Sequence, residues 1–102
     1  LIMSMFRIGL QMKIEFSTEA IKFLNKQDEK IKIKIIGKIK ELKYEVETNG
    51  LLPLKTFDIK ALQGEWYPHK RLRVGNIRVI FLVDISNDII RIPIIDNRGS
   101  AY

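Results

Sequence analysis

The feature that most constrains this chain is a change in the spacing of its apolar residues near Gly64. Before that point, apolar residues recur every three or four positions, as they do on one face of a helix. After it, short runs rich in β-branched residues end at turn residues, which is typical of strands. With 102 residues, 46% of them hydrophobic, the chain is long enough for one domain around one core. The two halves together predict an α+β domain.

Two helices are predicted in the first half. Ser17-Thr-Glu-Ala20 combines a capping hydroxyl with an acidic residue in the first turn, so a short helix should begin there and end near Lys26. Asp28 can cap a second helix, although residues 30–35 alternate like a strand. The longer apolar stripe favours the helix, because its members recur at helical spacing: Ile31, Ile35, Ile39, Leu42 and Val46. Asn49-Gly50 is typical of a helix end. The expected result is an antiparallel helical hairpin.

The strands are predicted from turn residues and apolar runs. A first strand is expected over residues 12–16, and residues 51–63 are expected to be a connection without regular structure. Three more strands are expected over 65–74, 77–84 and 89–95, separated by Gly75-Asn76 and by a second turn at 86–88. Pro93 indicates an edge or an irregular position for the last strand. The predicted fold is therefore a helical hairpin packed on a small, mainly antiparallel sheet, in the order β-α-α-β-β-β.

The domain is expected to run from residue 12 to residue 102. We interpret residues 1–11 as an extension that need not be native, with an extra edge strand as the alternative. The chain contains no cysteine, which excludes disulfides and thiolate metal sites. One histidine and scattered carboxylates do not form a recognisable metal motif, and no apolar run approaches the length of a membrane span. We expect a cytoplasmic protein that needs no metal and no cofactor.

Arginine is unevenly distributed along the chain. The formal net charge is +6, which favours a polyanion or an acidic protein as partner, although a lysine-rich composition alone is the plainer explanation. Five of the six arginines lie in the strand half, whereas lysine is concentrated in the helices: the five are Arg71, Arg73, Arg78, Arg91 and Arg98. Because the planar guanidinium fork binds phosphate through two hydrogen bonds, arginines on strands are more informative than lysines on a solvated helix.

Strand alternation sorts these side chains onto faces. His69, Arg71 and Arg73 should share one face of their strand and Lys70 the other. If Gly75-Asn76 is a two-residue turn, Arg73 lies directly across from Arg78. Like charges opposite one another are destabilising unless an anion neutralises them, and this cost is the physical reason to suspect a phosphate site.

Such a set of residues can cleave RNA without a metal. A base removes the proton of the 2′-hydroxyl, an acid protonates the leaving oxygen, and cations stabilise the extra negative charge. An imidazole such as that of His69 can act as acid or base near neutral pH, and Tyr102 can act as a base if nearby arginines lower its pKa. Arg71, Arg78 and Arg98 are the candidates for holding the phosphate. The plainer interpretation makes His69 a surface or capping residue and each arginine a solvated charge.

Three stretches of the chain resemble the RelE/ParE superfamily of type II toxins. They are Leu62-Gln-Gly-Glu-Trp-Tyr67, Arg71-Leu-Arg-Val-Gly-Asn-Ile-Arg-Val-Ile-Phe81 and Asn97-Arg-Gly-Ser-Ala-Tyr102. The resemblance covers residues 12–102 and implies an mRNA endonuclease that works in the ribosomal A site and is silenced by a cognate acidic antitoxin. It also implies a catalytic set, which matches Arg71, Arg78, Arg98 and Tyr102. We further expect Lys70 and Arg73 to bind RNA.

Two positions depart from the family pattern. His69 stands where the RelE branch often has lysine, which leaves open whether His69 or Tyr102 is the base, and Ile77 replaces the usual tyrosine before Arg78. The alternative within the superfamily is a ParE-like toxin, which poisons DNA gyrase and does not cleave RNA. A non-enzymatic DNA-binding module is a third possibility, but no helix-turn-helix or basic arm supports it.

Overall fold

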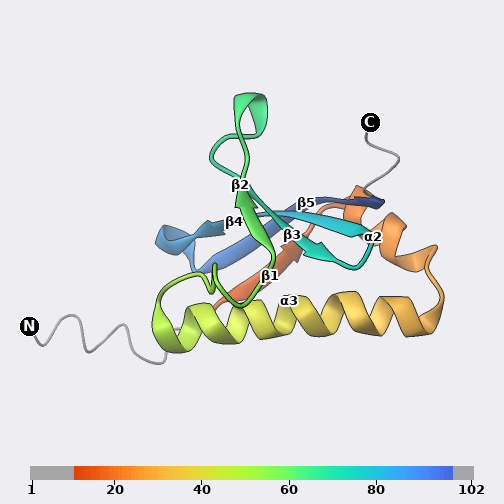
Figure 1. The fold of residues 1–102 in the computed structure, drawn as a ribbon, viewed down its shortest axis with the longest axis horizontal. Helices are drawn as coiled ribbons and strands as arrows, with labels where there is room; N and C mark the ends of the chain where they lie inside the picture. The colour runs from red at the N-terminus through yellow and green to blue at the C-terminus, as the bar shows by residue number, and fades with distance from the viewer. Residues whose placement is uncertain (1–10, 98–102) are drawn as a thin grey trace, which may run out of the picture.

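The computed structural model describes residues 11–97, which form a five-stranded sheet with both helices against one of its faces (Figure 1). The strands are β1 (Lys13–Phe16), β2 (Ile59–Ala61), β3 (Lys70–Val74), β4 (Ile77–Asp84) and β5 (Ile89–Asn97). The helices are α2 (Thr18–Asn25) and α3 (Glu29–Asn49), with 3₁₀ turns η1 (Gly64–Trp66) and η2 (Ile85–Asn87). Across the sheet the order is β1-β5-β4-β3-β2, with β1 parallel to β5 and the other pairs antiparallel. The predicted α+β fold with a mainly antiparallel sheet is confirmed.

Both helices begin and end as the sequence predicts. The Ser17 hydroxyl accepts a hydrogen bond from the Ala20 amide at 3.0 Å, and the Asp28 carboxylate accepts one from the Ile31 amide at 2.9 Å. Gly50 ends α3 in the left-handed conformation, with φ of 69°. These caps satisfy amide and carbonyl groups that a helix end leaves without partners, so they set the length of each helix.

The core lies between the helices and one face of the sheet. α3 buries four residues of the predicted stripe, whereas Ile31 at its start is 38% exposed, because the stripe extends beyond the part of the helix that the sheet covers. The sheet contributes alternate residues to the same core: Leu72, Val74, Ile77, Val79, Phe81, Ile90, Ile92 and Ile95. Burying each of these side chains stabilises the fold by about 1.5–3 kcal/mol. The residues between them must therefore face the opposite side of the sheet.

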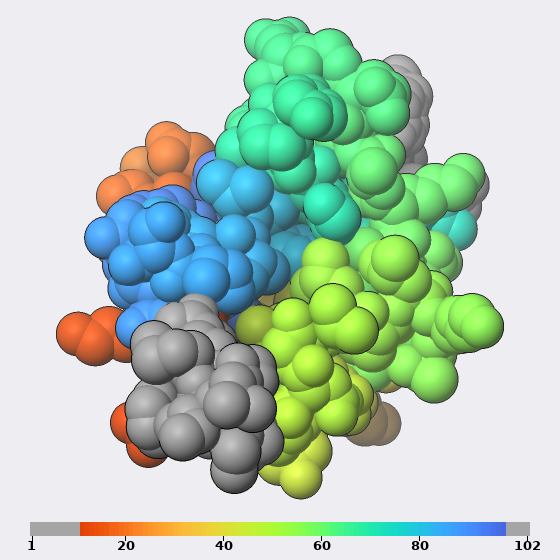
Figure 2. All heavy atoms as spheres, turned by 90° about the vertical axis from the view of Figure 1, so that its left-hand side faces the viewer, coloured from red at the N-terminus to blue at the C-terminus, as the bar shows by residue number. Residues whose placement is uncertain are grey.

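The connection between α3 and β3 differs from the prediction. Residues 59–61 form the short edge strand β2, which pairs antiparallel with β3 and which three residues with one large apolar side chain could not reveal. The predicted strand over 65–74 begins only at Lys70, because η1 and the following turn occupy residues 64–68. This segment projects from the sheet on the side away from α3 (Figure 1), and it forms the top of the space-filling view (Figure 2).

β5 is an inner strand and not an edge strand, but Pro93 lies one residue past its last pair with β1 and at an irregularity of its pairing with β4, so the predicted irregular position is confirmed. β5 pairs with β1 on one side and with β4 on the other. The register between β4 and β5 shifts by one residue between Ile80 and Leu82, and Pro93 stands on β5 opposite this shift. Proline has no amide proton for the ladder, and a bulge is where a central strand tolerates that loss.

Candidate functional site: an arginine face on the sheet

The sheet face opposite the helices carries the predicted arginines. β3 and β4 pair as expected, with Val74 across from Ile77 and Arg73 across from Arg78. The neighbours of these arginines along each strand belong to the core, so strand alternation directs Arg71, Arg73 and Arg78 to the open face. Lys60 of β2 is the cross-strand partner of Arg71 and extends the same face toward the sheet edge. We call these four residues and their acidic partners the arginine face.

Carboxylates within the chain already contact these arginines. Asp96 of β5 accepts hydrogen bonds from Arg78 Nε at 3.0 Å and Nη2 at 2.9 Å, which is the two-point contact that guanidinium groups favour. Asp58 lies 3.2 Å from Arg71 Nη1 and 3.7 Å from Arg73 Nη1. The repulsion between Arg73 and Arg78 is therefore offset inside the protein. The repulsion within this pair is therefore not in itself a reason to expect an external anion.

The positive charge that remains uncompensated lies on the β2–β3 side of the face. One Asp58 carboxylate serves both Arg71 and Arg73, and Lys60 beside them is exposed. The Arg71 side chain is only 8% exposed, whereas that of Arg73 is 33% exposed. Arg73 Nε is buried and has no hydrogen-bond partner among the described residues. Arg73 is thus the least completely paired of the three guanidiniums, and its side chain is more exposed to an added anion than those of Arg71 and Arg78.

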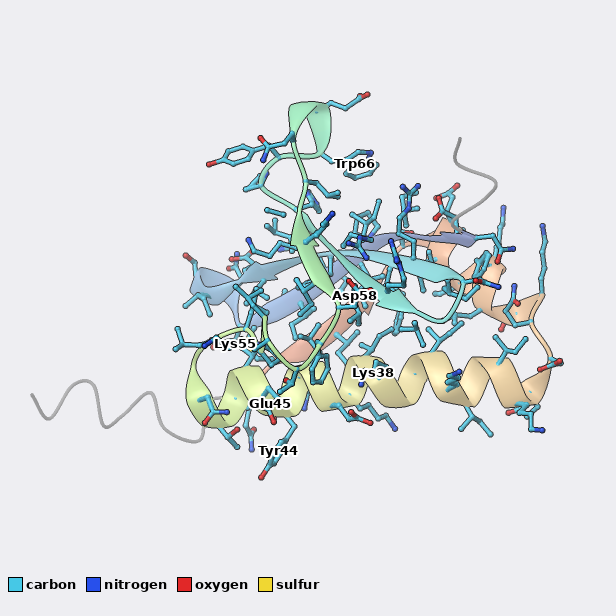
Figure 3. All side chains as sticks on the ribbon, in the orientation of Figure 1. Lys38, Tyr44, Glu45, Lys55, Asp58 and Trp66 are labelled. Atoms are coloured by element: carbon cyan, nitrogen blue, oxygen red, sulfur yellow. The ribbon has the colours of Figure 1, made fainter. Side chains whose placement is uncertain are left out.

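His69 precedes β3 and is held by the 3₁₀ turn. Its backbone amide donates to the Trp66 carbonyl at 2.7 Å, and its ring Nδ1 lies 2.9 Å from the same oxygen. The Trp66 ring stands edge-on to the imidazole, with centroids 5.3 Å apart and planes at 81°. These contacts favour the tautomer with a proton on Nδ1, which leaves Nε2 able to accept one. Figure 3 places Trp66 on the opposite side of the sheet from Lys38 and Tyr44 of α3.

A second acidic and basic network lies at the His69 end of the sheet. Arg91 of β5 contacts Glu15 of β1 at 2.5 Å and Asp84 of β4 at 3.1 Å. Hydrogen bonds from the Asn87 side chain and from Arg91 hold the pKa of Asp84 below its usual value. Asp84 and Glu15 in turn raise the pKa of Arg91, so this guanidinium stays charged at any physiological pH. With two carboxylates on one guanidinium, this end of the face carries excess negative charge.

The structure brings together some of the predicted site residues and separates others. His69, Arg71, Arg73 and Arg78 share the open face, whereas Lys70 pairs with Phe81 on the helix side of the sheet. Arg98 and Tyr102 lie outside the described residues. No group of three or more histidines and carboxylates within residues 11–97 could hold a metal, and no helix there is long and apolar enough to cross a membrane.

No protein-family model and no curated protein matches the sequence, but solved structures do. RelE in the archaeal RelE–RelB complex from Pyrococcus horikoshii OT3 matches with a TM-score of 0.68 and 24% identity, over 87% of this chain and 97% of that one. The chain has the RelE fold. The RelB–RelE antitoxin–toxin complex from Methanococcus jannaschii matches with a TM-score of 0.62 and 26% identity, over 86% of this chain and 94% of that one. The YoeB–YefM complex from Staphylococcus aureus matches with a TM-score of 0.61 and 23% identity, over 84% of this chain and 95% of that one.

Sequence reasoning assigned no role to four residues of this RelE-like sheet: Asp58, Asp96, Arg91 and Glu15. Asp96 is three residues past Pro93, and the bulge there changes which side chains of β5 face outward. Asp58 precedes a strand that was not predicted. A signal did exist for Arg91, because it is an arginine in a predicted strand. Its partner Glu15, however, is 76 positions away, and only the parallel pairing of β1 with β5 brings the two together.

Proposed function

We propose that this chain is the toxin of a type II toxin–antitoxin system and cleaves messenger RNA in the ribosomal A site without a metal. The proposal rests on the RelE fold together with one observation. Lys60, Arg71 and Arg73 form a cationic patch that, among residues 11–97, has one carboxylate partner, next to His69 and on the sheet face that the helices leave open. An RNA phosphate is an anion of the size and charge that such a patch binds.

The reaction is an attack of the RNA on its own backbone. The 2′-oxygen forms a bond to the adjacent phosphorus while the bond from phosphorus to the 5′-oxygen of the next nucleotide breaks, which leaves a cyclic phosphate and a free 5′-hydroxyl. Arg71, Arg78 and Arg98 are assigned to the negative charge that grows on the phosphate. His69 and Tyr102 are assigned to the two proton transfers, one to remove the 2′-proton and one to protonate the leaving oxygen.

The carboxylates on the arginine face determine which side chain the RNA phosphate contacts first. A phosphate that contacts Arg78 must compete with Asp96 at 2.9 Å, whereas one that contacts Arg73 meets a longer ion pair, at 3.7 Å, on a more exposed side chain. We therefore assign the first phosphate contact to Arg73 and Lys60. Arg78 then exchanges the Asp96 carboxylate for the RNA phosphate, and this exchange costs less free energy than leaving the guanidinium without a partner.

The partner assigned to the chain is an acidic antitoxin encoded beside it. The RelE of Methanococcus jannaschii and the YoeB of Staphylococcus aureus both match this chain in complexes with RelB and YefM, respectively. The net charge of +6 favours an acidic partner, and the ribosomal target places the protein in the cytoplasm. Co-expression with the neighbouring reading frame should yield a stable complex that masks the toxicity.

Primer extension on messenger RNA in a translating extract tests the activity. Wild-type protein should produce cuts inside codons at the A site, and Arg78→Gln should lower the cleavage rate by about two to three orders of magnitude, as for a lost oxyanion donor. Lys40→Gln on the exposed side of α3 removes the same charge and should cleave normally. Circular dichroism must first show that Arg78→Gln is folded.

Two outcomes contradict the proposal. One is a folded Arg78→Gln protein that cleaves at the wild-type rate, which would remove Arg78 from the site. The other is wild-type protein that leaves messenger RNA intact but traps gyrase on cleaved DNA, which would make the chain ParE-like.

A further inference from the structure

A cavity of about 340 Å³ lies beside His69 on the open side of the sheet. It is lined by Glu15, Phe16, Ser17, His69, Arg91 and Pro93, among others. Its volume falls within the range of about 300–1,000 Å³ that small-molecule sites span. None of the activities considered above requires this cavity, and Arg91 and Glu15 have no part in the proposed catalytic set.

The charge in this cavity does not suit a phosphate. Arg91 contacts both Glu15 and Asp84, so two carboxylates surround one guanidinium, and a further anion would meet more negative than positive charge. The cationic patch of Lys60, Arg71 and Arg73 has the opposite balance. The two ends of the same sheet face are therefore suited to different parts of a ligand, an anionic part at one end and a neutral part at the other.

The chemistry of the cavity suits a flat, neutral group with donors and acceptors on its edge. His69 offers a ring surface, Arg91 offers N–H donors, and Glu15 offers acceptor oxygens. Arginine pairs with the acceptor edge of guanine, and a carboxylate accepts from the amino groups of cytosine or adenine. RNA-binding proteins recognise unstacked bases by this combination of ring stacking and edge hydrogen bonds.

The cavity is also held in shape. Arg91 is fixed from two strands by its carboxylate partners, and the Ser17 hydroxyl donates to the Pro93 carbonyl at 2.5 Å. Trp66 holds the His69 ring on the other side. Little side-chain freedom is lost when a ligand enters a site that is ordered in this way, and a weak edge contact can then discriminate between bases.

The geometry points to a nucleobase subsite: we propose that this cavity binds one unstacked base of the RNA whose phosphate contacts the cationic patch. The inference rests on the proposed function, because it assumes an RNA substrate. Arg91 lies across from Leu82, which is two residues along β4 from Ile80, the partner of Arg71. The two arginines are therefore offset by about 7 Å along the strands and by two strand spacings, about 10 Å, across them, which puts their backbones about 12 Å apart. The subsite and the phosphate patch therefore lie within the reach of neighbouring nucleotides, and the subsite sets the base preference.

Binding of mononucleotides tests the subsite without any cleavage. The full chain, with its aromatic side chains labelled with ¹³C, is titrated with AMP, GMP, CMP and UMP, and with ribose 5-phosphate as the probe that lacks a base. We expect shifts of the Phe16 and His69 ring signals that differ between the four nucleotides and are absent with ribose 5-phosphate. Equal shifts with ribose 5-phosphate would show that the cavity reads the phosphate, and no shift with any nucleotide would show that it is not a binding site. Either result overturns the proposal.

Variants then assign the discrimination to particular side chains. Arg91→Gln should weaken binding of the preferred nucleotide about tenfold, which corresponds to one lost base contact. Glu15→Gln should change the order of preference, because an amide can donate as well as accept. Lys40→Gln, which changes the net charge by the same amount as Arg91→Gln, should leave binding unchanged. Wild-type affinity and preference in both folded pocket variants would overturn the assignment.

The cleavage map separates this proposal from the proposed function. In the translating extract, the readout for the pocket variants is the distribution of cuts among sequences and not their total number. Cuts by Arg91→Gln that keep the wild-type distribution would overturn the subsite and leave the endonuclease standing. Conversely, base-dependent binding by a protein that makes no cuts would support the subsite and contradict the endonuclease.

Discussion

Replacing Asp96 by asparagine removes the charge that holds Arg78 on the open face. The carboxylate accepts two hydrogen bonds from Arg78, at 2.9 and 3.0 Å, and the two side chains are 27% and 15% exposed. Asparagine keeps one acceptor but turns an N–H₂ group toward the guanidinium, so one hydrogen bond and the ionic attraction are lost. Arg73, directly across from Arg78, then repels it with less compensation.

The size of the effect follows from this partial burial. An exposed ion pair contributes about 0–1 kcal/mol, whereas breaking a buried one costs about 3–5 kcal/mol. A hydrogen bond to a charged group contributes about 1.5–3 kcal/mol. For a pair at intermediate exposure, we expect Asp96→Asn to lower the free energy of unfolding by about 2 kcal/mol. In a domain of this size, that corresponds to a Tm lower by about 8–16 °C.

Urea denaturation at pH 7, followed by circular dichroism, measures the change. Glu41→Gln on α3 is the matched control, because it removes one negative charge from a side chain that is 63% exposed and should change the stability by less than about 0.5 kcal/mol. If Asp96→Asn were as stable as this control, the contact between Arg78 and Asp96 would not contribute to the fold. The argument that the arginine face is neutralised from within would then fail.

Three further predictions concern positions away from this face. Glu47→Gln should lower the free energy of unfolding by about 1 kcal/mol at pH 7. Lys43 and the Met12 amide lower the pKa of Glu47 from 4.5, so this contribution is present above pH 4.5 and is lost as the pH falls through the pKa of the folded state. Denaturation at pH 7 and pH 3 should therefore show a smaller difference between variant and wild type at the lower pH. Gly50→Ala should cost about 1–2 kcal/mol in thermal unfolding, because its φ is 69°. Ser17→Ala should cost about 1–2 kcal/mol, and an unchanged Tm would exclude Ser17 as an effective cap.

Local signals in the sequence were sufficient for the helices and for the β3–β4 hairpin. Ser17, Asp28 and Gly50 act through hydrogen bonds and backbone angles within a few residues, so the sequence alone predicts them. The hairpin depends on Gly75, whose φ of 62° a two-residue turn accommodates without strain. The pairing of Arg73 with Arg78 follows from that turn by counting. Local chemistry therefore predicted both the main elements and the face on which three arginines lie.

The features that sequence reasoning missed depend on contacts between distant segments. β2 forms because its backbone pairs with the free edge of β3, whereas its own three residues have no pattern that predicts a strand. Asp96 reaches Arg78 because the bulge at Pro93 shifts the register of β5. The resemblance of the motifs to known toxins predicted the fold, but it did not predict the carboxylates that pair with the arginines. Such partners are a property of this chain's own tertiary contacts.

The internal pairing of the arginines changes what the open face can do without a ligand. Several guanidiniums close together on a bare sheet would repel one another, so a chain with this face folds stably only if it supplies anions of its own. Asp58 and Asp96 do so from outside the β3–β4 hairpin, one before β2 and one near the end of β5. They also order the guanidiniums before any ligand binds. The cost is competition, because a phosphate must replace a carboxylate at Arg78, whereas at Arg73 and Lys60 it meets a site only partly neutralised. Affinity on this face is therefore set by the carboxylates as much as by the arginines.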